Sequence, residues 1–375
     1  MKRMIVFLML AVLIALPVAN VFAVSEAAVL FLMISPGARA AGMGEAFVAQ
    51  SDDATAVYWN PAGLAFQRGR EISIMHAKWL PQLVSDMSYE FVAYRQYVES
   101  LGGTIGGNVT FLNLGEQYYT DENGPEILDT FRSFDLAVSL SYATELTPNL
   151  GMGVSMRYIQ SNLAPMGAGE EQGTGKGNSF AVDLGLLYKL KFMPGLRFGM
   201  NLSNMGPKIT YIDAAQADPL PTNLRIGFAY DVLDMEFNKL TLTIDTNKLL
   251  VVRYYEDEDG KRVKASEYMD MDEEERDKLQ PKSDPFYKAL FTAWTNDPFK
   301  DQMRRLISSV GMEYLYNNMI ALRAGYYYDE EGKVKYPAFG AGLTYSNYKF
   351  DFAYVAAEQG HPLSDTMRFS LSANF

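Results

Sequence analysis

From residue 72 to the last residue, the chain is a series of short segments in which apolar and polar side chains alternate. A period of two is typical of β-strands, and residues that favour turns bound the segments. Most segments have about the length that a tilted strand needs to cross an outer membrane. The fourteen segments are 72–79, 88–96, 103–112, 134–146, 150–162, 178–191, 195–204, 222–234, 237–247, 307–317, 319–328, 336–345, 348–357 and 366–375.

The alternation gives these segments one apolar face and one polar or small face. In 150–162 the apolar face is Met152, Val154, Met156 and Tyr158, opposite Gly151, Gly153, Ser155 and Arg157. The polar faces of 134–146 and 237–247 include Asp135, Ser139, Ser141, Thr243 and Asp245. A soluble sandwich would show the same alternation with its apolar face inward, so the faces alone do not separate a sandwich from a membrane barrel.

Loop lengths favour the barrel, because connections along the strands alternate between short and long. The short ones are 97–102, 147–149, 192–194, 235–236, residue 318 and 346–347, and the long ones are 80–87, 113–133, 163–177, 205–221, 248–306, 329–335 and 358–365. Short periplasmic turns and long outer loops are the layout of bacterial outer-membrane barrels. The sequence therefore predicts an all-β fold, a 14-stranded antiparallel transmembrane β-barrel.

The first 23 residues are typical of a secretory signal peptide. Lys2 and Arg3 precede an apolar run over 4–16, and Val21-Phe22-Ala23 fits a cleavage site after residue 23. The alternative is an uncleaved membrane anchor, which the early interruption of the apolar run disfavours. Without the two N-terminal cations, 31 of the 33 basic residues remain against 45 acidic ones, a net charge of −14. An acidic exported chain is not expected to bind nucleic acid.

Composition argues against several kinds of catalytic and metal site. Cysteine is absent, so there is no disulfide framework, zinc-cysteine site or cysteine nucleophile. The two histidines, His76 and His361, have no nucleophile motif near them. The carboxylate runs 256–259 and 270–275 lack the spacing of an EF-hand loop. We therefore expect no catalytic residue, no metal and no cofactor.

The segment 38–66 is the part of the chain richest in residues with narrow backbone or packing roles. Its glycines permit positive φ or close backbone approach, its paired aspartates suggest a turn or cap, and its Asn-Pro pair marks a chain reversal. The candidate residues are Arg39, Gly42, Met43, Gly44, Asp52, Asp53, Tyr58, Trp59, Asn60, Pro61 and Gly63. Two interpretations are open here, namely a compact plug held inside something larger and an ordered N-terminal loop.

The longest loop, 248–306, departs most from a bare barrel. It begins with a charged run at 256–262, which predicts a solvated turn, and continues with expected helices at 272–279, 284–294 and 297–306. The Asp-Pro pairs at 284–285 and 297–298 predict an aspartate N-cap with proline at the first helical position. An apolar stripe of Phe286, Leu290, Phe291 and Trp294 has helical spacing. It would pack on the barrel rim, which we favour, or form a docking face for a partner.

Several segments resemble a known family. GARAAGMGEAFVAQSDDATAVYWNPAGLAF, at 37–66, resembles the N-terminal signature of the PorV/PorQ outer-membrane proteins, distant relatives of the FadL fatty-acid channels. FYKALFTAWTNDPFKDQMRRLISSVGMEYLYNNMIALRAGYYY and HPLSDTMRFSLSANF resemble C-terminal segments of the PorV members. The final Phe375, closing an alternating strand, resembles the insertion signal of outer-membrane barrels. One departure is 299–305, where we expect a glycine-containing stretch in the family.

This resemblance implies a FadL-like barrel over 72–375 in the bacterial outer membrane, with 24–71 folded into the lumen as a hatch. On that basis we expect 42–44 and 60–63 to shape the hatch, and Arg39, Asp52 and Asp53 to pair with polar lumen residues.

The resemblance also implies a role in type IX secretion. PorV-like barrels bind the C-terminal signal domains of exported cargo, associate with the translocon barrel and pass cargo to a surface attachment complex. The outer-loop residues that we expect to bind partners are Phe286, Phe291, Trp294, Phe299, His361 and Pro362. The alternatives are a FadL-like transporter of hydrophobic small molecules, which the polar inward faces disfavour, and a lipid-modifying outer-membrane enzyme, for which no Ser-His-acid set is recognisable.

Overall fold

The computed structural model describes most of the chain. The described residues are 27–120, 127–164, 175–211, 217–264, 267–268, 271–276, 278–358 and 361–375. The expected signal peptide at 1–23 lies outside them. Among the described residues, no helix combines the length and apolar character needed to span a membrane.

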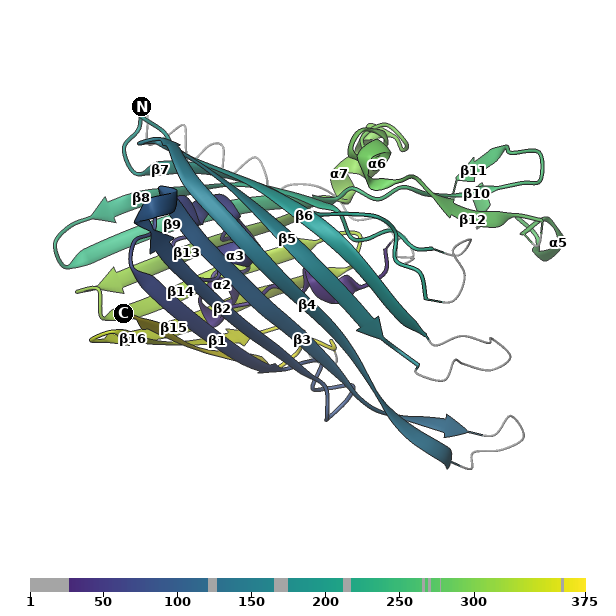
Figure 1. The fold of residues 1–375 in the computed structure, drawn as a ribbon, viewed down its shortest axis with the longest axis horizontal. Helices are drawn as coiled ribbons and strands as arrows, with labels where there is room; N and C mark the ends of the chain where they lie inside the picture. Colours follow the sequence, from purple (N-terminus) through teal and green to yellow (C-terminus); the bar gives the residue numbers. More distant parts are fainter. Residues whose placement is uncertain are drawn as a thin grey trace.

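Fourteen antiparallel strands close into one barrel, which confirms the predicted fold (Figure 1). The wall strands are β1 (Arg70–Lys78), β2 (Ser88–Val98), β3 (Gly103–Thr120), β4 (Ile127–Thr147), β5 (Leu150–Asn162), β6 (Lys176–Lys189), β7 (Leu196–Met205), β8 (Asn223–Asp234), β9 (Asn238–Leu249), β13 (Ile307–Tyr316), β14 (Ile320–Asp329), β15 (Val334–Tyr345), β16 (Tyr348–Val355) and β17 (Thr366–Asn374). Consecutive wall strands pair with each other, and β9 pairs directly with β13 across the longest loop.

The barrel closes where β1 pairs with β17. His76 lies opposite Phe369 in this pairing, and Ile74 lies opposite Leu371. The backbone of Arg70 and that of Phe375 exchange two hydrogen bonds at the seam. Closure leaves no unpaired strand edge, which is the condition for a sheet to lie in hydrocarbon.

The two faces of the strands decide between a barrel and a sandwich. On β5, Ser155 and Arg157 are buried inside the barrel, whereas Met156 and Tyr158 are exposed on the outside. The same order holds on β17, where Arg368 points inward and is buried. A sandwich would bury its apolar face instead, so the outward apolar face identifies a wall that lies in lipid.

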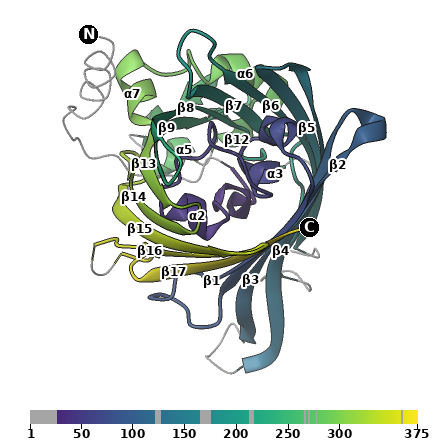
Figure 2. The ribbon, with the colours of Figure 1, turned by 90° about the vertical axis from the view of Figure 1, so that its left-hand side faces the viewer.

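The structure corrects the predicted loop lengths at two places. The predicted loop 113–133 is largely strand, because β3 and β4 continue as a hairpin beyond the barrel (Figures 1 and 2). The pairing of β3 with β4 shifts register after Asn113, near Gly115, which has φ 82°. This shift interrupts the alternation of apolar and polar residues, so the sequence pattern did not reveal the continuing strands. The predicted long loop 329–335 is a short turn over 330–333. The connections at the two ends of the barrel therefore differ less in length than predicted.

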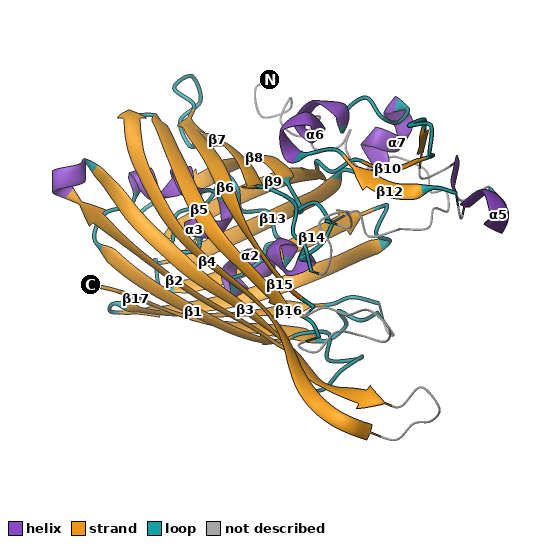
Figure 3. Cartoon of the chain, turned by 45° about the vertical axis from the view of Figure 1, so that its right-hand side comes forward, coloured by secondary structure: helices purple, strands orange, loops and turns teal. Residues whose placement is uncertain are grey.

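The longest loop contains a small sheet that the sequence did not predict (Figure 3). Its strands are β10 (Arg253–Glu256), β11 (Arg262–Lys264) and β12 (Gln280–Ser283), and its helices are α5 (Glu273–Arg276), α6 (Phe286–Thr292) and α7 (Phe299–Arg304). Strands this short carry too few residues for a period of two to be recognised. The charged run forms the turn between β10 and β11, with Gly260 at φ 79°. All three helices are shorter than predicted.

The N-terminal segment folds inside the barrel. Its elements are η1 (Leu30–Met33), α2 (Ala38–Ala41), α3 (Ala56–Trp59) and η2 (Pro61–Phe66). Figure 2, a view along the barrel, shows α2 and α3 surrounded by the wall. We call residues 27–69 the hatch.

Glycines on the inward face of the wall make room for the hatch backbone. A Cβ atom added to Gly325 would lie 2.1 Å from the carbonyl carbon of Met43, and one added to Gly153 would lie 2.4 Å from that of Pro61. A Cβ added to Gly151, Gly185, Gly199 or Gly311 would also lie within 3.0 Å of a hatch backbone atom. The wall and the hatch are therefore complementary in shape at the level of the backbone.

This complementarity predicts that Gly325→Ala destabilises the hatch by about 1–3 kcal/mol, because overpacking forces backbone shifts. Gly102→Ala is the control, since Gly102 lies in the β2–β3 connection and a Cβ there would meet no atom within 4 Å, so any strain from its φ of 59° stays in that turn. The measurement is tryptic release of the hatch from detergent-solubilised protein. Equal release from both variants would show that the wall does not hold the hatch in this way.

Candidate functional site

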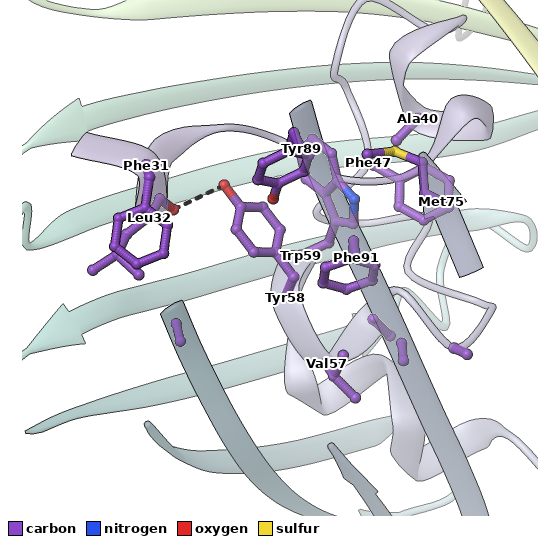
Figure 4. Close-up of a cluster of buried hydrophobic side chains, with 14 of the residues drawn as sticks. Phe31, Leu32, Ala40, Phe47, Val57, Tyr58, Trp59, Met75, Tyr89 and Phe91 are labelled. Carbon is purple, nitrogen blue, oxygen red and sulfur yellow. Dashed lines mark hydrogen bonds between the residues drawn. The ribbon is translucent and has the colours of Figure 1, made fainter. Parts of the chain in front are cut away.

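The centre of the hatch is an apolar cluster built around Trp59 (Figure 4). The indole ring of Trp59 packs edge-on against the rings of Phe47 and Tyr58 at centroid distances of 5.8 and 5.4 Å. Its Nε1 donates to the carbonyl of Pro36 at 3.1 Å, so the buried polar atom is satisfied. Removing such a fully buried aromatic side chain typically costs about 3–5 kcal/mol. The cluster also contains the wall residues Met75, Tyr89 and Phe91, so the hatch and the wall share one apolar core.

The chain reversal predicted at 60–63 fixes the path of the hatch. The Asn60 amide donates to the carbonyls of Val48 and Leu186, and its oxygen accepts from the backbone N–H of Ala62. Asn60 thereby caps η2 and ties the hatch to the wall. Gly63 is needed because a Cβ there would lie 2.0 Å from the Ser51 carbonyl oxygen.

The predicted glycines at 42 and 44 lie against the wall. A Cβ on Gly42 would be 2.9 Å from the Cα of Gly340, and one on Gly44 would be 2.5 Å from the backbone nitrogen of Tyr326. Gly44 has φ 62°, a backbone conformation that residues with a Cβ atom rarely adopt. Met43 between them is fully buried.

Arg39 joins the hatch to the wall through an ion pair. Its guanidinium donates two hydrogen bonds to Glu313 on β13, at 2.9 and 2.7 Å. Glu313 also accepts from Arg323 at 2.6 Å, and Arg323 lies 2.7 Å from Asp351. We call these four residues the lumenal ion network. Two hydrogen bonds between a guanidinium and a carboxylate combine charge with fixed geometry, which makes this contact strong.

The expectation for the two aspartates was wrong. Asp52 and Asp53 pair with Arg39 inside the hatch, at 2.5 and 2.9 Å, and not with the wall. Asp53 also accepts from the backbone N–H and the hydroxyl of Thr55. Because the hatch folds back on itself, its own arginine is nearer to these carboxylates than any wall cation is.

Sequence reasoning missed the wall residues that hold the hatch. Glu313 and Arg323 belong to the lumenal ion network, and Asp245 accepts from the backbone N–H groups of Phe47 and Val48 at 2.7 and 2.8 Å. The available signal was a charged residue at an inward position of an alternating strand. An inward position on a strand indicates that the side chain faces the lumen, but it does not indicate which residue the side chain pairs with.

The outer helices present an exposed apolar surface. Its residues are Tyr287, Phe291, Trp294, Phe299 and Met303, which we call the α6–α7 patch. Phe291 is 76% exposed and Phe299 is 79% exposed. The structure thus divides the predicted stripe, because Leu290 packs against Leu250 and Val252 while Phe291 and Trp294 face outward. The favoured interpretation, packing on the rim, was wrong for Phe291, whereas Trp294 is half exposed and keeps one contact with the wall through Lys248.

Ion pairs fix the helices that carry the patch. Arg304 lies 3.0 Å from Glu330, and Arg305 lies 3.3 Å from Glu331, so α7 is attached to the β14–β15 turn. The amine of Lys248 is 4.6 Å from the centre of the Trp294 ring. The patch is therefore held in place on the rim.

The predicted aspartate N-caps of α6 and α7 were both wrong by one position, and Pro298 caps α7. Pro285 is the capping residue of α6, and Asp284 instead binds Lys288 at 2.9 Å and the Thr292 hydroxyl at 2.9 Å. Burial alone would raise the pKa of Asp284, but these hydrogen bonds and nearby Arg262 outweigh burial and hold the pKa below its usual value. Proline at 285 has an extended ψ of 152°, so the helix begins one residue later.

The six predicted partner-binding residues fall in two places. Phe286, Phe291, Trp294 and Phe299 lie on α6, on α7 or between them, and Phe286 is half-buried. His361 and Pro362 lie in the β16–β17 connection, separated from β9 by β13, β14 and β15. The sequence analysis missed Tyr287 and Met303, although each is four residues from a predicted aromatic on the same helix.

The lumen is tightly filled where the hatch meets the wall. Two cavities there, one beside Glu45 and Tyr327 and one beside Tyr58 and Arg157, have volumes of about 10 Å³ each. Such a volume holds about one water molecule.

His76 lies on the outside of the barrel. Its Nδ1 is 2.7 Å from the Glu90 carboxylate, and no serine hydroxyl among the described residues bonds to its ring.

Comparison with known proteins identifies the family. The family model "Type IX secretion system protein PorV" matches residues 19–255, more than half of the 375-residue chain. The chain belongs to the PorV family. Its place is accordingly the bacterial outer membrane, as a component of type IX secretion.

Solved structures share the fold of this PorV family member. The Pseudomonas putida toluene transporter TodX has 14% identity and a TM-score of 0.52, covering 90% of this chain and 96% of that one. The TodX monoaromatic hydrocarbon channel deltaS2 mutant has 14% identity and a TM-score of 0.53, covering 91% and 99%. A Pseudomonas aeruginosa FadL homologue has 10% identity and a TM-score of 0.47, covering 90% and 97%. None of the curated proteins matches the sequence.

The pattern of loop lengths sets the expected orientation of the barrel. In outer-membrane barrels the short turns face the periplasm and the long loops face outward. We therefore expect the α6–α7 patch at the cell surface, and turns such as 148–149 and 346–347 at the periplasmic rim.

The lumenal ion network predicts that Arg39→Met loosens the hatch by about 3 kcal/mol, because breaking a buried pair leaves carboxylates without their cation. The readout is the denaturant midpoint of hatch release in detergent. Arg70→Met is the control, since Arg70 is exposed and has no ion pair with the described residues. If both variants release the hatch at the same midpoint, the network does not hold it.

The environment of Asp284 predicts a pH dependence for α6. A folded pKa below the unfolded value of about 3.9 stabilises the helix above that pH, and the stabilisation is lost as pH falls through the folded pKa. We expect Asp284→Asn to speed hydrogen exchange of 286–292 at neutral pH and to remove the acid-induced change. Asp301→Asn, whose carboxylate is half exposed and 4.0 Å from Arg304, should leave exchange unchanged. An unchanged Asp284→Asn variant would contradict this account.

Proposed function

We propose that the protein captures the C-terminal signal domain of exported cargo through the α6–α7 patch. It then associates with the type IX translocon barrel and passes the cargo to the surface attachment complex. The observation that carries the proposal is the exposed aromatic surface at 287–303. Exposed contiguous apolar surface on a soluble part of a protein marks an interaction site.

The composition of the α6–α7 patch supports a protein partner. Tyr287, Phe291, Trp294 and Phe299 supply aromatic rings, and Met303 adds a flexible apolar side chain. Aromatic residues and methionine are enriched in the centres of protein interfaces. Arg304 and Arg305 hold α7 in place, so little ordering entropy is lost when a partner binds.

The filled lumen favours this reading over transport. A carrier of hydrophobic small molecules needs a pocket of roughly 300–1,000 Å³, whereas the two cavities between hatch and wall hold about 10 Å³ each. The lumen centre is apolar, contrary to expectation, but the hatch residues Phe47 and Trp59 occupy it.

The test is capture of a purified signal domain by the detergent-solubilised protein. The double variant Phe291→Ser with Phe299→Ser should weaken binding roughly thirtyfold, because truncating central aromatics costs about 2 kcal/mol or more. The matched control, Phe192→Ser with Phe237→Ser, changes two exposed aromatics at the opposite rim and should bind as the wild type does.

The alternatives make different predictions. Unchanged capture by the α6–α7 double variant would move the binding site elsewhere. A tagged protein that copurifies with lipid, but with no cargo and no secretion component, would favour transport. Ester hydrolysis abolished by changing one serine would favour an enzyme.

A further inference from the structure

The periplasmic rim contains a cavity of about 430 Å³. It lies at the β6–β7 connection, 190–195, and reaches Asn149 in the β4–β5 turn and Asp231 on β8. Its volume is within the range of roughly 300–1,000 Å³ that is usual for small-ligand sites. The proposed capture of cargo does not use this end of the molecule.

Positive charge dominates the cavity lining. Its charged residues are Lys189, Lys191 and Arg197 against the single carboxylate of Asp231. This excess occurs in a chain whose net charge is −12. A cavity lined by one sign of charge concentrates the opposite ion.

The carboxylate of Asp231 is already occupied. One oxygen accepts from Arg197 at 3.0 Å and from the Thr241 hydroxyl at 2.8 Å. The other lies 3.4 Å from the amine of Lys239. Asp231 therefore cannot neutralise the two lysines of the lining.

The remaining donors have no acceptor within the described protein. The amine of Lys189 lies 3.6 Å from the centre of the Phe66 ring, and neither it nor Lys191 forms an ion pair with a described residue. The buried Nε of Arg197 has no hydrogen-bond partner among the described residues. This Nε has almost no accessible surface, so the donors open to a ligand are the two lysine amines, and a lining of unpaired cations attracts an anion.

We propose that this cavity binds a phosphate group. Three cationic side chains around one cavity suit an oxyanion with several acceptor oxygens and more than one charge better than they suit a single carboxylate. The two lysines can act as point charges, and Arg197, which already donates to Asp231 and Gln50, adds to the positive charge of the lining. The same chemistry is offered by a phospholipid head group and by free phosphate.

The cavity lies at the depth of lipid head groups, while its lining side chains Lys189 and Arg197 contact the hatch residues Phe66 and Gln50 on the lumen side. Phe192, at the apex of the same connection, is 78% exposed. Exposed aromatic residues at a barrel rim lie at the membrane interface, so the cavity is at the level of lipid phosphates.

The site is also connected to the hatch. Arg197 donates to the Gln50 side chain at 2.9 Å, and Gln50 donates to Asp52 at 2.8 Å. Asp52 in turn pairs with Arg39. A ligand that holds Arg197 would therefore stabilise the hatch, since binding to the folded state raises its stability.

The experiment uses the full chain in nanodiscs of phosphatidylcholine with or without phosphatidylglycerol, and in detergent with inorganic phosphate. The variant is Lys189→Gln with Lys191→Gln, and the control removes the same charge at the outer rim with Lys78→Gln and Lys335→Gln. Retained phospholipid is measured by native mass spectrometry, and the hatch is followed by tryptic release. We expect Lys189→Gln with Lys191→Gln to weaken binding of the phosphate-bearing probe roughly tenfold or more, because charge-assisted hydrogen bonds are lost. The control variant should bind the probe as the wild type does.

The outcomes separate the two sources of phosphate. Retention of phosphatidylglycerol that the first variant loses supports a head group. Protection of the hatch by inorganic phosphate, without lipid retention, supports free phosphate. The proposal is overturned if neither probe distinguishes the first variant from the control, or if only acidic peptides bind at the cavity.

Discussion

Hydrogen bonding of the backbone in hydrocarbon is the constraint on which the structure depends. Lipid cannot satisfy a free strand edge, so the sheet must close, and it does so where β1 meets β17. Closure fixes which side chains face lipid and which face the lumen. It also creates an interior wide enough to need filling, because the inward faces carry many glycines and small polar residues.

The hatch fills that interior by two kinds of contact. Glycines such as Gly325 let its backbone approach the wall, while Arg39 and Glu313 join hatch and wall through charge. These contacts use the same inward positions that a channel would leave open. Surfaces for partners and ligands therefore lie at the two rims, the α6–α7 patch outside and the cationic cavity at the periplasmic end.

The sequence predicted the wall well because period two is a local property that each strand displays by itself. It failed at 113–133, where a register shift breaks the alternation and pairing with the neighbouring strand maintains the hairpin. Within the hatch it assigned Asp52 and Asp53 the wrong partner. Pairing within a folded segment depends on how the chain turns back on itself, and spacing does not show this.

The sequence by itself determined the closed β architecture and the apolar outer face, because these follow from alternation and loop length. Only the tertiary structure decided which charged residues meet in the lumen and which aromatics stay exposed. Arg39 and Glu313 are 274 positions apart, and Leu290 and Phe291 are neighbours with opposite environments. Contacts of this kind exist only in the closed barrel, since closure brings distant strands around the hatch.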